Sequence, residues 1–231
     1  MSKKRNQILY VGIDECPSHK TTFPIYIVGV DSLDSKDVKI TNPRRIEQKR
    51  RNRYQERTQN PLIEQRIPLI GRDFSYVLLT SEERGDYGYG FLWDAMVCTL
   101  IRHYMGVSNN GFNSAEDIGH LEVHIDGGPK NLRENDKYVA DAIENGALNI
   151  LYHSKKGKSI SPDVPLVHES DAIAYGLFSQ LSKRKVMFNN LFKRPENDPN
   201  RVPFEKKDLE RMIAAYKLKD KDVYRKAKNR T

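Results

Sequence analysis

The hydrophobic and polar positions of this chain repeat with two different periods, which predicts strands in some segments and helices in others. Short β-branched and aromatic runs between polar turns are typical of strands, and longer runs with apolar residues at helical spacing are typical of helices. The pattern predicts the order βββαβαβα, with the first two strands antiparallel. The strands are expected at 8–13, 23–30, 74–80, 121–125 and 147–152, and the helices at about 91–104, 132–144 and 168–183.

The predicted elements form one α/β domain, a five-stranded mixed sheet flanked by helices, over residues 1–185. A polar, proline-containing insertion at about 32–72 interrupts this domain and carries a basic helix. Residues 186–231 form a basic extension, in which 194–203 is expected to be a linker and 205–230 a helix or a partly disordered tail.

Acidic residues stand at the ends of two predicted strands. Alternate residues of a strand share a face, so Asp14 and Asp126 each end one face of their strand. These faces are Tyr10, Gly12 and Asp14 in the first strand, and Glu122, His124 and Asp126 in the fourth. If the two strands are parallel neighbours, both carboxylates lie at the carboxyl edge of the sheet, where ligands usually bind. Asp31 ends the antiparallel second strand, so we expect it at the opposite end and exclude it from the site.

A third acid, Asp171, is expected near the start of the last helix, with His168 one turn before it. Carboxylates gathered in one place repel one another and need a cation. Hard oxygen ligands without cysteine partners favour Mg²⁺ or Mn²⁺, the metals that position phosphates. We therefore expect Asp14, Asp126 and Asp171 to be metal ligands.

The net charge of +8 is unevenly distributed. Residues 183–231 contain sixteen Lys and Arg against seven Asp and Glu, a net +9, which leaves −1 for the first 182 residues. Two further basic groups lie in the body of the chain, at Arg44, Arg45, Lys49, Arg50, Arg51 and Arg53, and at Lys155, Lys156 and Lys158. Such groups are either solvated surface or a binding surface for a polyanion, and their number favours nucleic acid as the partner.

The two cysteines, Cys16 and Cys98, form no metal-binding motif, and such sparse cysteine use is typical of a reducing compartment. The first apolar run stops after the length of a strand, which is too short for a signal peptide core or a membrane span. We expect an intracellular, cytoplasmic protein without a membrane partner. The sequence leaves the oligomeric state open, and a homodimer is one possibility.

Acids at the first strand, the fourth strand and the last helix, in this order of elements, resemble the ribonuclease H-like superfamily of metal-dependent nucleases and transferases. The segment GIDE at 12–15 is similar to the first-strand signature of type 2 ribonuclease H, and IDGG at 125–128 resembles the later Asp-Gly strand end of that enzyme. Cys16, Pro17 and Ser18 replace the glycine-arginine-glycine that follows Asp-Glu there. The spacing of His168 and Asp171 is similar to that in the last motif of RuvC-like junction resolvases. It is also similar to that in the closing helix of nuclease-like domains that open with an Asp-Glu-Ser strand.

The resemblance covers about 8–183 and implies two metal ions about 4 Å apart, bridged by Asp14, with Asp126 and Asp171 completing the shells. It implies that His168 assists proton transfer or contacts the substrate. The fourth ligand stays open among Glu15, Glu169, His168 and a helix-borne acid, Asp94, for which a surface position is the alternative.

The expected function is that of an enzyme, a divalent-metal-dependent nuclease that hydrolyses phosphodiester bonds in structured or duplex DNA or RNA. Two alternatives have the same charge pattern. One is a non-catalytic ribonuclease H-like protein that binds nucleic acid, and the other is an assembly protein with acidic partners.

Overall fold

The structure is a computed structural model, and it describes residues 7–16, 24–39, 73–80, 87–106, 118–126, 136–153, 164–181, 198–204 and 208–210. The main elements in these residues follow the predicted order βββαβαβα, with a short 3-10 helix after the second strand. The strands are β1 (Gln7–Cys16), β2 (Ile25–Ser32), β3 (Phe74–Leu79), β4 (Ile118–Ile125) and β5 (Leu148–Tyr152). The helices are η1 (Ser35–Val38), α3 (Tyr89–Tyr104), α5 (Lys137–Glu144) and α6 (Pro165–Leu181).

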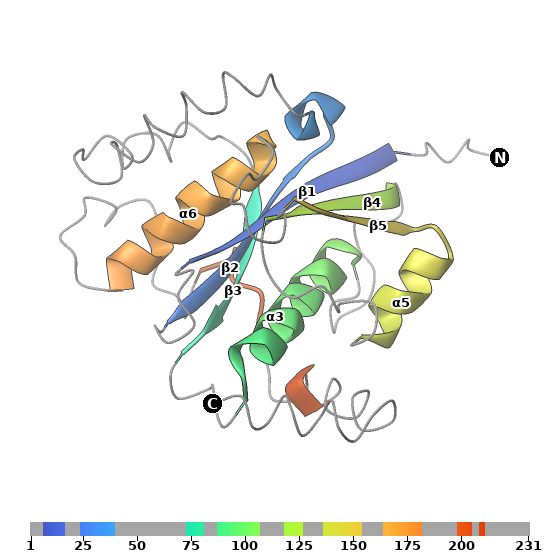
Figure 1. The fold of residues 1–231 in the computed structure, drawn as a ribbon. Helices are drawn as coiled ribbons and strands as arrows, with labels where there is room; N and C mark the ends of the chain where they lie inside the picture. The colour runs from blue at the N-terminus through green and yellow to red at the C-terminus, as the bar shows by residue number, and fades with distance from the viewer. Residues whose placement is uncertain are drawn as a thin grey trace.

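The strands form one mixed sheet in the order β3-β2-β1-β4-β5 (Figure 1). β2 pairs antiparallel with both β1 and β3, whereas the pairs β1–β4 and β4–β5 are parallel. This confirms the predicted α/β class with a five-stranded mixed sheet and the antiparallel first pair. It also makes the two acid-bearing strands, β1 and β4, parallel neighbours in the centre of the sheet.

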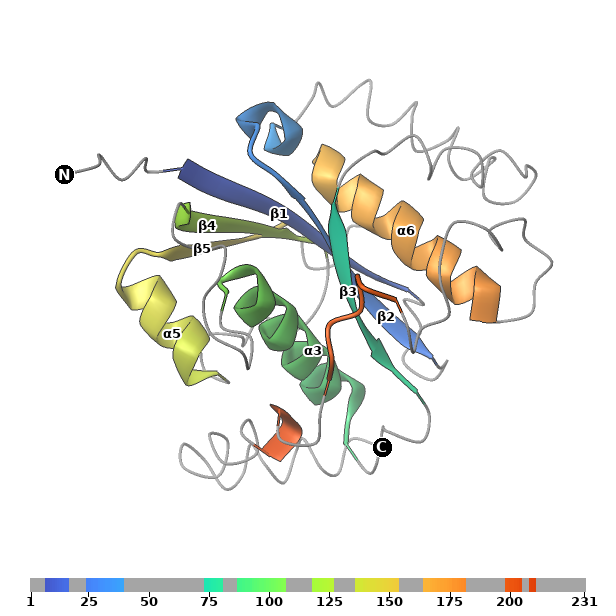
Figure 2. The same cartoon turned by 180° about the vertical axis from the view of Figure 1, so that it is seen from behind.

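Helices cover both faces of the sheet, with α3 and α5 on one face and α6 on the other (Figures 1 and 2). The alternation within each strand explains the two layers, because successive side chains point to opposite faces. Val11 and Ile13 of β1 belong to the core under α3. On the other face of the sheet, Val28 of β2 and Ile173 of α6 belong to a second core. Residues on the α6 side of β1 therefore include Gly12 and Asp14.

Most predicted boundaries differ from the observed ones by one to five residues, and three of the differences bear on the site or on the helix ends. β1 continues to Cys16, so Asp14 and Glu15 lie within the strand, where Asp14 is the register partner of Val28. The predicted helix at 132 begins at Lys137, because the Asp136 carboxylate caps it by accepting from two backbone N–H groups. The last helix begins at Pro165 rather than at 168, and proline at a first helical position has the backbone angle that a helix requires.

Part of the expected linker lies against the edge of the sheet. The backbone of Tyr76 in β3 donates to the Asn200 carbonyl at 2.9 Å, and its carbonyl accepts from the Val202 N–H at 2.8 Å. Val202 is 7% exposed and belongs to the core under α3, as does Leu209. The described residues at 198–204 thus cover the outer edge of β3, which would otherwise offer unpaired backbone groups.

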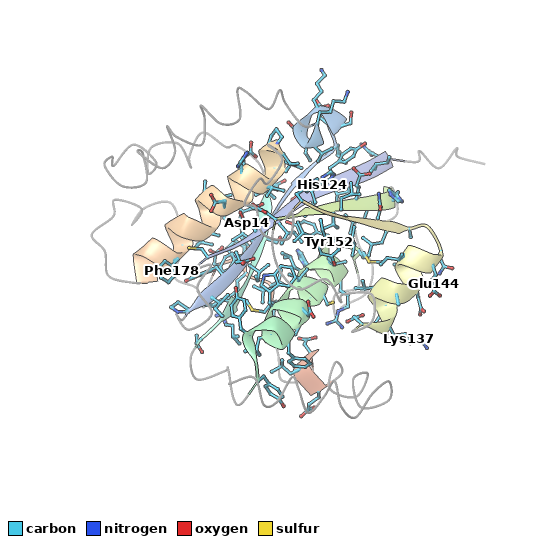
Figure 3. All side chains as sticks on the ribbon, viewed as in Figure 1. Asp14, His124, Lys137, Glu144, Tyr152 and Phe178 are labelled. Atoms are coloured by element: carbon cyan, nitrogen blue, oxygen red, sulfur yellow. The ribbon has the colours of Figure 1, made fainter. Side chains whose placement is uncertain are left out.

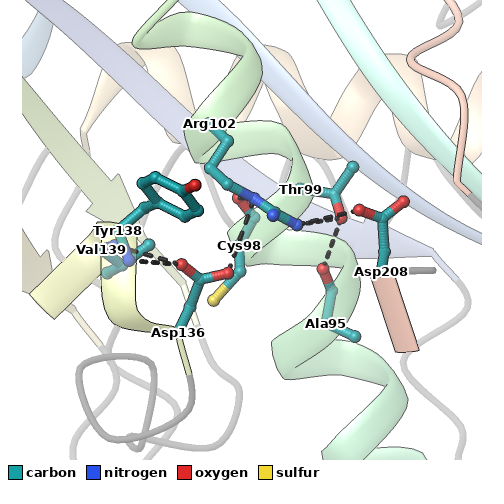
Figure 4. A network of polar contacts seen from close by, with 8 residues as sticks. All are labelled: Ala95, Cys98, Thr99, Arg102, Asp136, Tyr138, Val139 and Asp208. Atoms are coloured by element: carbon teal, nitrogen blue, oxygen red, sulfur yellow. Dashed lines mark hydrogen bonds and ion pairs between the residues drawn. The ribbon is translucent and has the colours of Figure 1, made fainter. Parts of the chain in front are cut away.

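A buried ionic cluster connects α3, α5 and the C-terminal residues (Figure 4). The Arg102 guanidinium lies 3.1 Å from the Asp208 carboxylate and, through Nε, 3.5 Å from the Asp136 carboxylate. Arg102 is 4% exposed and Asp136 is 3% exposed, so this charge is compensated inside the protein. Asp136 has two roles here, since it also caps α5.

Candidate functional site

Asp14 and Asp126 lie side by side at the carboxyl edge of the sheet. The parallel register pairs Gly12 with His124 and Ile13 with Ile125, so the next position along each strand is an aspartate. The Asp126 N–H donates to the Ile13 carbonyl at 3.2 Å, which continues the pairing to that position. Both aspartates are half-buried. The prediction that these two acids lie beside each other on parallel neighbouring strands is confirmed, although Asp14 lies two residues before the end of β1.

Helix α6 crosses β1 two residues before Asp14. The Ser170 hydroxyl lies 2.5 Å from the Gly12 carbonyl, and a Cβ atom on Gly12 would lie only 2.3 Å from the Leu166 carbonyl carbon. Glycine at this position therefore permits the close approach of helix and strand. Asp171 directly follows Ser170, so the third predicted acid lies on α6 next to the residue that contacts β1.

Because α6 begins at 165, Asp171 lies in its second turn and not at its start, and His168 is part of the helix. The His168 N–H donates to the Val164 carbonyl at 3.1 Å. His168, Glu169 and Asp171 are each half-buried. The predicted position of Asp171 at the helix start is thus corrected, while its spacing from His168 holds.

The donor chemistry of the site fits a hard divalent cation, since Asp14, Asp126 and Asp171 offer carboxylate oxygens without a thiolate. Within the residues that the structure describes, no group of three or more His, Cys, Asp or Glu side chains is arranged to hold a metal ion. The structure therefore supplies the pair of strand-end carboxylates and the helix crossing, but not a closed set of ligands.

Glu15 points to the other face of the sheet, towards α3. Its carboxylate accepts a hydrogen bond from the Trp93 indole at 2.7 Å, and the Tyr89 hydroxyl lies 3.5 Å away. Burial raises the pKa of Glu15 from 4.5 to about 7; the bond from Trp93 lowers it and the nearby Asp126 charge raises it. Alternation along β1 thus separates Glu15 from Asp14, although Asp14 Oδ1 accepts from the Glu15 backbone N–H at 2.8 Å.

Asp94, the helix-borne alternative for the fourth ligand, faces the interior. It is 1% exposed on α3, and its charge raises the pKa of Tyr152 at the end of β5, after the larger effect of burial. The alternative of a surface position for Asp94 is therefore wrong. Because Asp94 lies near the carboxyl end of β5, it stays a candidate for the fourth ligand.

Asp31 lies near the end of β2, level with the middle of β1 and away from Asp14. It is the register partner of Val11, three positions before Asp14 on β1. Burial and the neighbouring Asp73 raise the pKa of Asp31 to about 6. Its exclusion from the site is confirmed by the register.

The sequence did not predict that three polar side chains on the α6 face, Glu122, His124 and His153, are bonded to one another. His124 bonds to Glu122 through Nε2 at 2.8 Å and to His153 through Nδ1 at 2.7 Å. Figure 3 shows His124 and Asp14 labelled on the neighbouring strands β4 and β1. Alternation predicts that Glu122 and His124 share one face of their strand. His153 could not be found in this way, because the strand before it contains no acidic residue.

The basic residues predicted to bind nucleic acid lie outside the described residues. They are Arg44, Arg45, Lys49, Arg50, Arg51, Arg53, Lys155, Lys156 and Lys158. Their roles stay predictions.

Comparison with models of known protein families gives no match to this chain, and comparison with curated proteins gives none either. Among the helices that the structure describes, none combines the length and the apolar character needed to cross a membrane.

Proposed function

We propose that this protein is a divalent-metal-dependent nuclease that hydrolyses phosphodiester bonds in structured or duplex nucleic acid. One observation carries the proposal: Asp14 on β1 and Asp126 directly after β4 lie side by side on parallel neighbouring strands, two residues beyond the place where α6 crosses β1. The carboxyl edge of an α/β sheet is where such proteins usually bind ligands.

The arrangement of the sheet supports a ribonuclease H-like fold. In the order β3-β2-β1-β4-β5, β2 runs opposite to its neighbours, and the acids stand on β1, after β4 and on the last helix. This agrees with the order of elements and acids that the sequence shares with that superfamily. The match in topology supports the fold, whereas the activity rests on the site.

Asp14, Asp126 and Asp171 would hold the metal, and Glu15, Glu169, His168 and Asp94 stay candidates for a fourth ligand. A bound Mg²⁺ or Mn²⁺ supplies positive charge that activates water and stabilises a leaving oxygen. Backbone pairing of β1 and β4 places two of these acids side by side. The glycine at 12 lets α6, which carries the third acid, pack closely against β1.

The basic groups would bind the phosphate backbone. Neutralising Arg50, Arg51 and Arg53 is expected to weaken binding and to lower its salt dependence by about 0.9 in log–log slope for each lost phosphate contact on duplex DNA. An unchanged slope would identify that segment as solvated surface.

The decisive test is Asp14→Asn. Loss of a metal-binding carboxylate is expected to lower cleavage by about 10²–10³-fold, the scale for removing one group that stabilises the transition state. Binding of nucleic acid should persist, because the basic groups are unchanged. Cleavage of labelled duplex, hybrid, junction and single-stranded DNA and RNA in Mn²⁺ measures the first effect, and a filter-binding titration measures the second.

Asp31→Asn is the matched control, since it removes a carboxylate from the same sheet, away from Asp14. It should leave cleavage unchanged. Full cleavage by Asp14→Asn, or no cleavage by the unaltered protein on any of these substrates, would contradict the proposed function. Salt-dependent binding without cleavage would instead identify a non-catalytic nucleic-acid-binding protein.

A further inference from the structure

Two carboxylates lie directly opposite each other where the chain leaves the sheet for the insertion and returns from it. β2 and β3 pair antiparallel as far as Val30 and Phe74, so Asp31 and Asp73 are the next positions on the two strands. The Asp31 N–H donates to the Asp73 carbonyl at 3.3 Å, which extends the pairing by one step. Because like charges directly opposite each other destabilise a strand pair, the base of the insertion contains a repulsive contact whenever both acids are ionised.

Both side chains lie on the face of the sheet that α3 covers. Ile27 of β2 and Val77 of β3 belong to the core under α3, and Asp31 and Asp73 lie four positions from them along the same strands. Asp31 is half-buried, whereas Asp73 is exposed. Water therefore solvates the charge of Asp73 more fully than that of Asp31.

Tyr104, the last residue of α3, lies against β2 beside Asp31. Its hydroxyl donates to the Gly29 carbonyl at 2.7 Å and is also close to the Asp31 carboxyl. A Cβ atom on Gly29 would lie 2.7 Å from Cε2 of Tyr104, so glycine at this position makes room for the ring. A hydroxyl carries one hydrogen, and Gly29 accepts it. Ionised Asp31 thus receives no hydrogen from Tyr104, whereas protonated Asp31 can donate to the Tyr104 oxygen.

The other described groups around Asp31 do not supply a compensating positive charge. Its register partner on β1 is the apolar Val11. On α3, His103 bonds through Nε2 to the Ser75 hydroxyl at 3.1 Å, and burial lowers the pKa of His103, which favours the neutral ring. Burial and, after it, the charge of Asp73 raise the pKa of Asp31 to about 6.

We propose that Asp31 makes the base of the insertion a pH-sensitive junction. When Asp31 is protonated, it donates to the Tyr104 hydroxyl and does not repel Asp73, so β2, β3 and the end of α3 are held together. When Asp31 is ionised, this bond is lost and two negative charges face each other, so the strand pair opens more readily at that point. The junction does not depend on the proposed nuclease function. It lies where the chain leaves the sheet towards the basic residues at 44–53.

The junction should weaken as pH rises. The folded pKa of Asp31 is raised, so its stabilising contribution is complete below the usual aspartate pKa of about 3.9 and is lost as pH rises through about 6. One pKa unit corresponds to a tenfold change in an equilibrium constant, and partial exposure of Asp31 reduces the full effect. We expect local opening at Asp31 to become about tenfold more frequent from about pH 5 to about pH 7.

Protonation of Asp31 is measured by carboxyl ¹³C spectra of the metal-free, ¹³C-labelled protein, with Asp31→Asn to assign the signal. We expect a midpoint of about 6. Asp73→Asn should lower this midpoint, because it removes the facing negative charge. Tyr104→Phe should also lower it, because the protonated carboxyl loses its acceptor. A midpoint of about 4 in the unaltered protein, no response to Asp73→Asn, or a midpoint that rises in Tyr104→Phe would overturn the proposal.

Opening of the strand pair is measured by hydrogen exchange of the residue 31 amide, corrected for the intrinsic effect of pH on exchange. Protection should fall about tenfold from about pH 5 to about pH 7 in the unaltered protein. It should stay constant in Asp31→Asn, whose side chain is neutral throughout. Asp34→Asn is the matched control, because Asp34 is an exposed acid that bonds to the Lys36 N–H in the following turn, and its pH response should equal that of the unaltered protein.

The Ile27 amide, further along the same strand, is the internal control and should not respond to pH in this range. Protection at Asp31 that is independent of pH, or that changes equally in Asp31→Asn, would overturn the junction. An equal change at Ile27 would identify a global loss of stability and would overturn it as well.

Discussion

Two of the regions that hold buried or half-buried carboxylates in the described structure compensate them differently. At the Arg102 cluster, Asp136 and Asp208 share one guanidinium within 3.5 Å. At the carboxyl edge, the hydrogen bonds to Glu15 come from the neutral indole of Trp93 and the neutral hydroxyl of Tyr89, and burial raises the pKa of Glu15 to about 7.

The difference separates a structural role from a candidate functional one. The carboxylates of the Arg102 cluster are paired with a cation and hold elements together, whereas Glu15, which is bonded to neutral donors, gains most from a proton. The following predictions test whether the two regions respond differently to mutation, to pH and to metal ions.

Arg102→Ala should have the largest effect on stability. It leaves two buried carboxylates uncompensated, and breaking a buried pair from one side costs about 3–5 kcal/mol in the free energy of unfolding. Urea unfolding followed by circular dichroism measures this loss. Lys36→Ala on the exposed turn of η1 is the control, with an effect within about 0.5 kcal/mol. A loss for Arg102→Ala as small as that of the control would show that the cluster does not hold α3 to α5.

Asp136→Asn and Asp126→Asn should change stability in different ways. Asparagine also caps helices well, so Asp136→Asn loses mainly the charge next to Arg102, at a cost of about 2 kcal/mol. Asp126→Asn in the metal-free protein removes a negative charge near Glu15, so its free energy of unfolding should stay the same or rise. Chelator-treated samples unfolded side by side give both values. Equal losses would remove the distinction between the two regions.

Glu15 should make the metal-free protein less stable as pH rises. Its folded pKa is raised, so its favourable contribution is complete below about pH 4.5 and is lost as pH increases through about 7. One pKa unit corresponds to about 1.4 kcal/mol, and partial exposure limits the total to about 2 kcal/mol. Asp31 adds to the slope in the same direction, so the measurement is the difference between the unaltered protein and Glu15→Gln. Parallel stability curves across this range would contradict the raised pKa.

Metal binding should give the smallest effect. A ligand that binds only the folded state at ten times its dissociation constant adds about 1.4 kcal/mol to the free energy of unfolding. We expect Mn²⁺ or Mg²⁺ to raise the melting temperature of the unaltered protein and of Asp31→Asn, and a chelator to reverse it. Asp126→Asn should not respond. An identical shift in Asp126→Asn would place the binding elsewhere.

Much of the fold was predictable because its signals are local. The two-residue period of strands and the longer period of helices gave the order of elements, and alternation placed Asp14 with Gly12 and Asp126 with His124. Element boundaries were harder to predict, because they depend on capping and packing. The start of α5 lies at Lys137 and not at 132, because the Asp136 carboxylate accepts from two backbone N–H groups there.

The sequence by itself determined the type of sheet and the strand faces on which Asp14, Asp126 and Glu15 lie. Only the tertiary structure decided the partners of those groups. Arg102 meets Asp208 across 106 positions, Trp93 meets Glu15 across 78, and His124 meets His153 across 29. Sequence periodicity fixes the face on which a side chain lies, but its partner is chosen by how strands and helices pack, and burial at that contact then sets its pKa and its role.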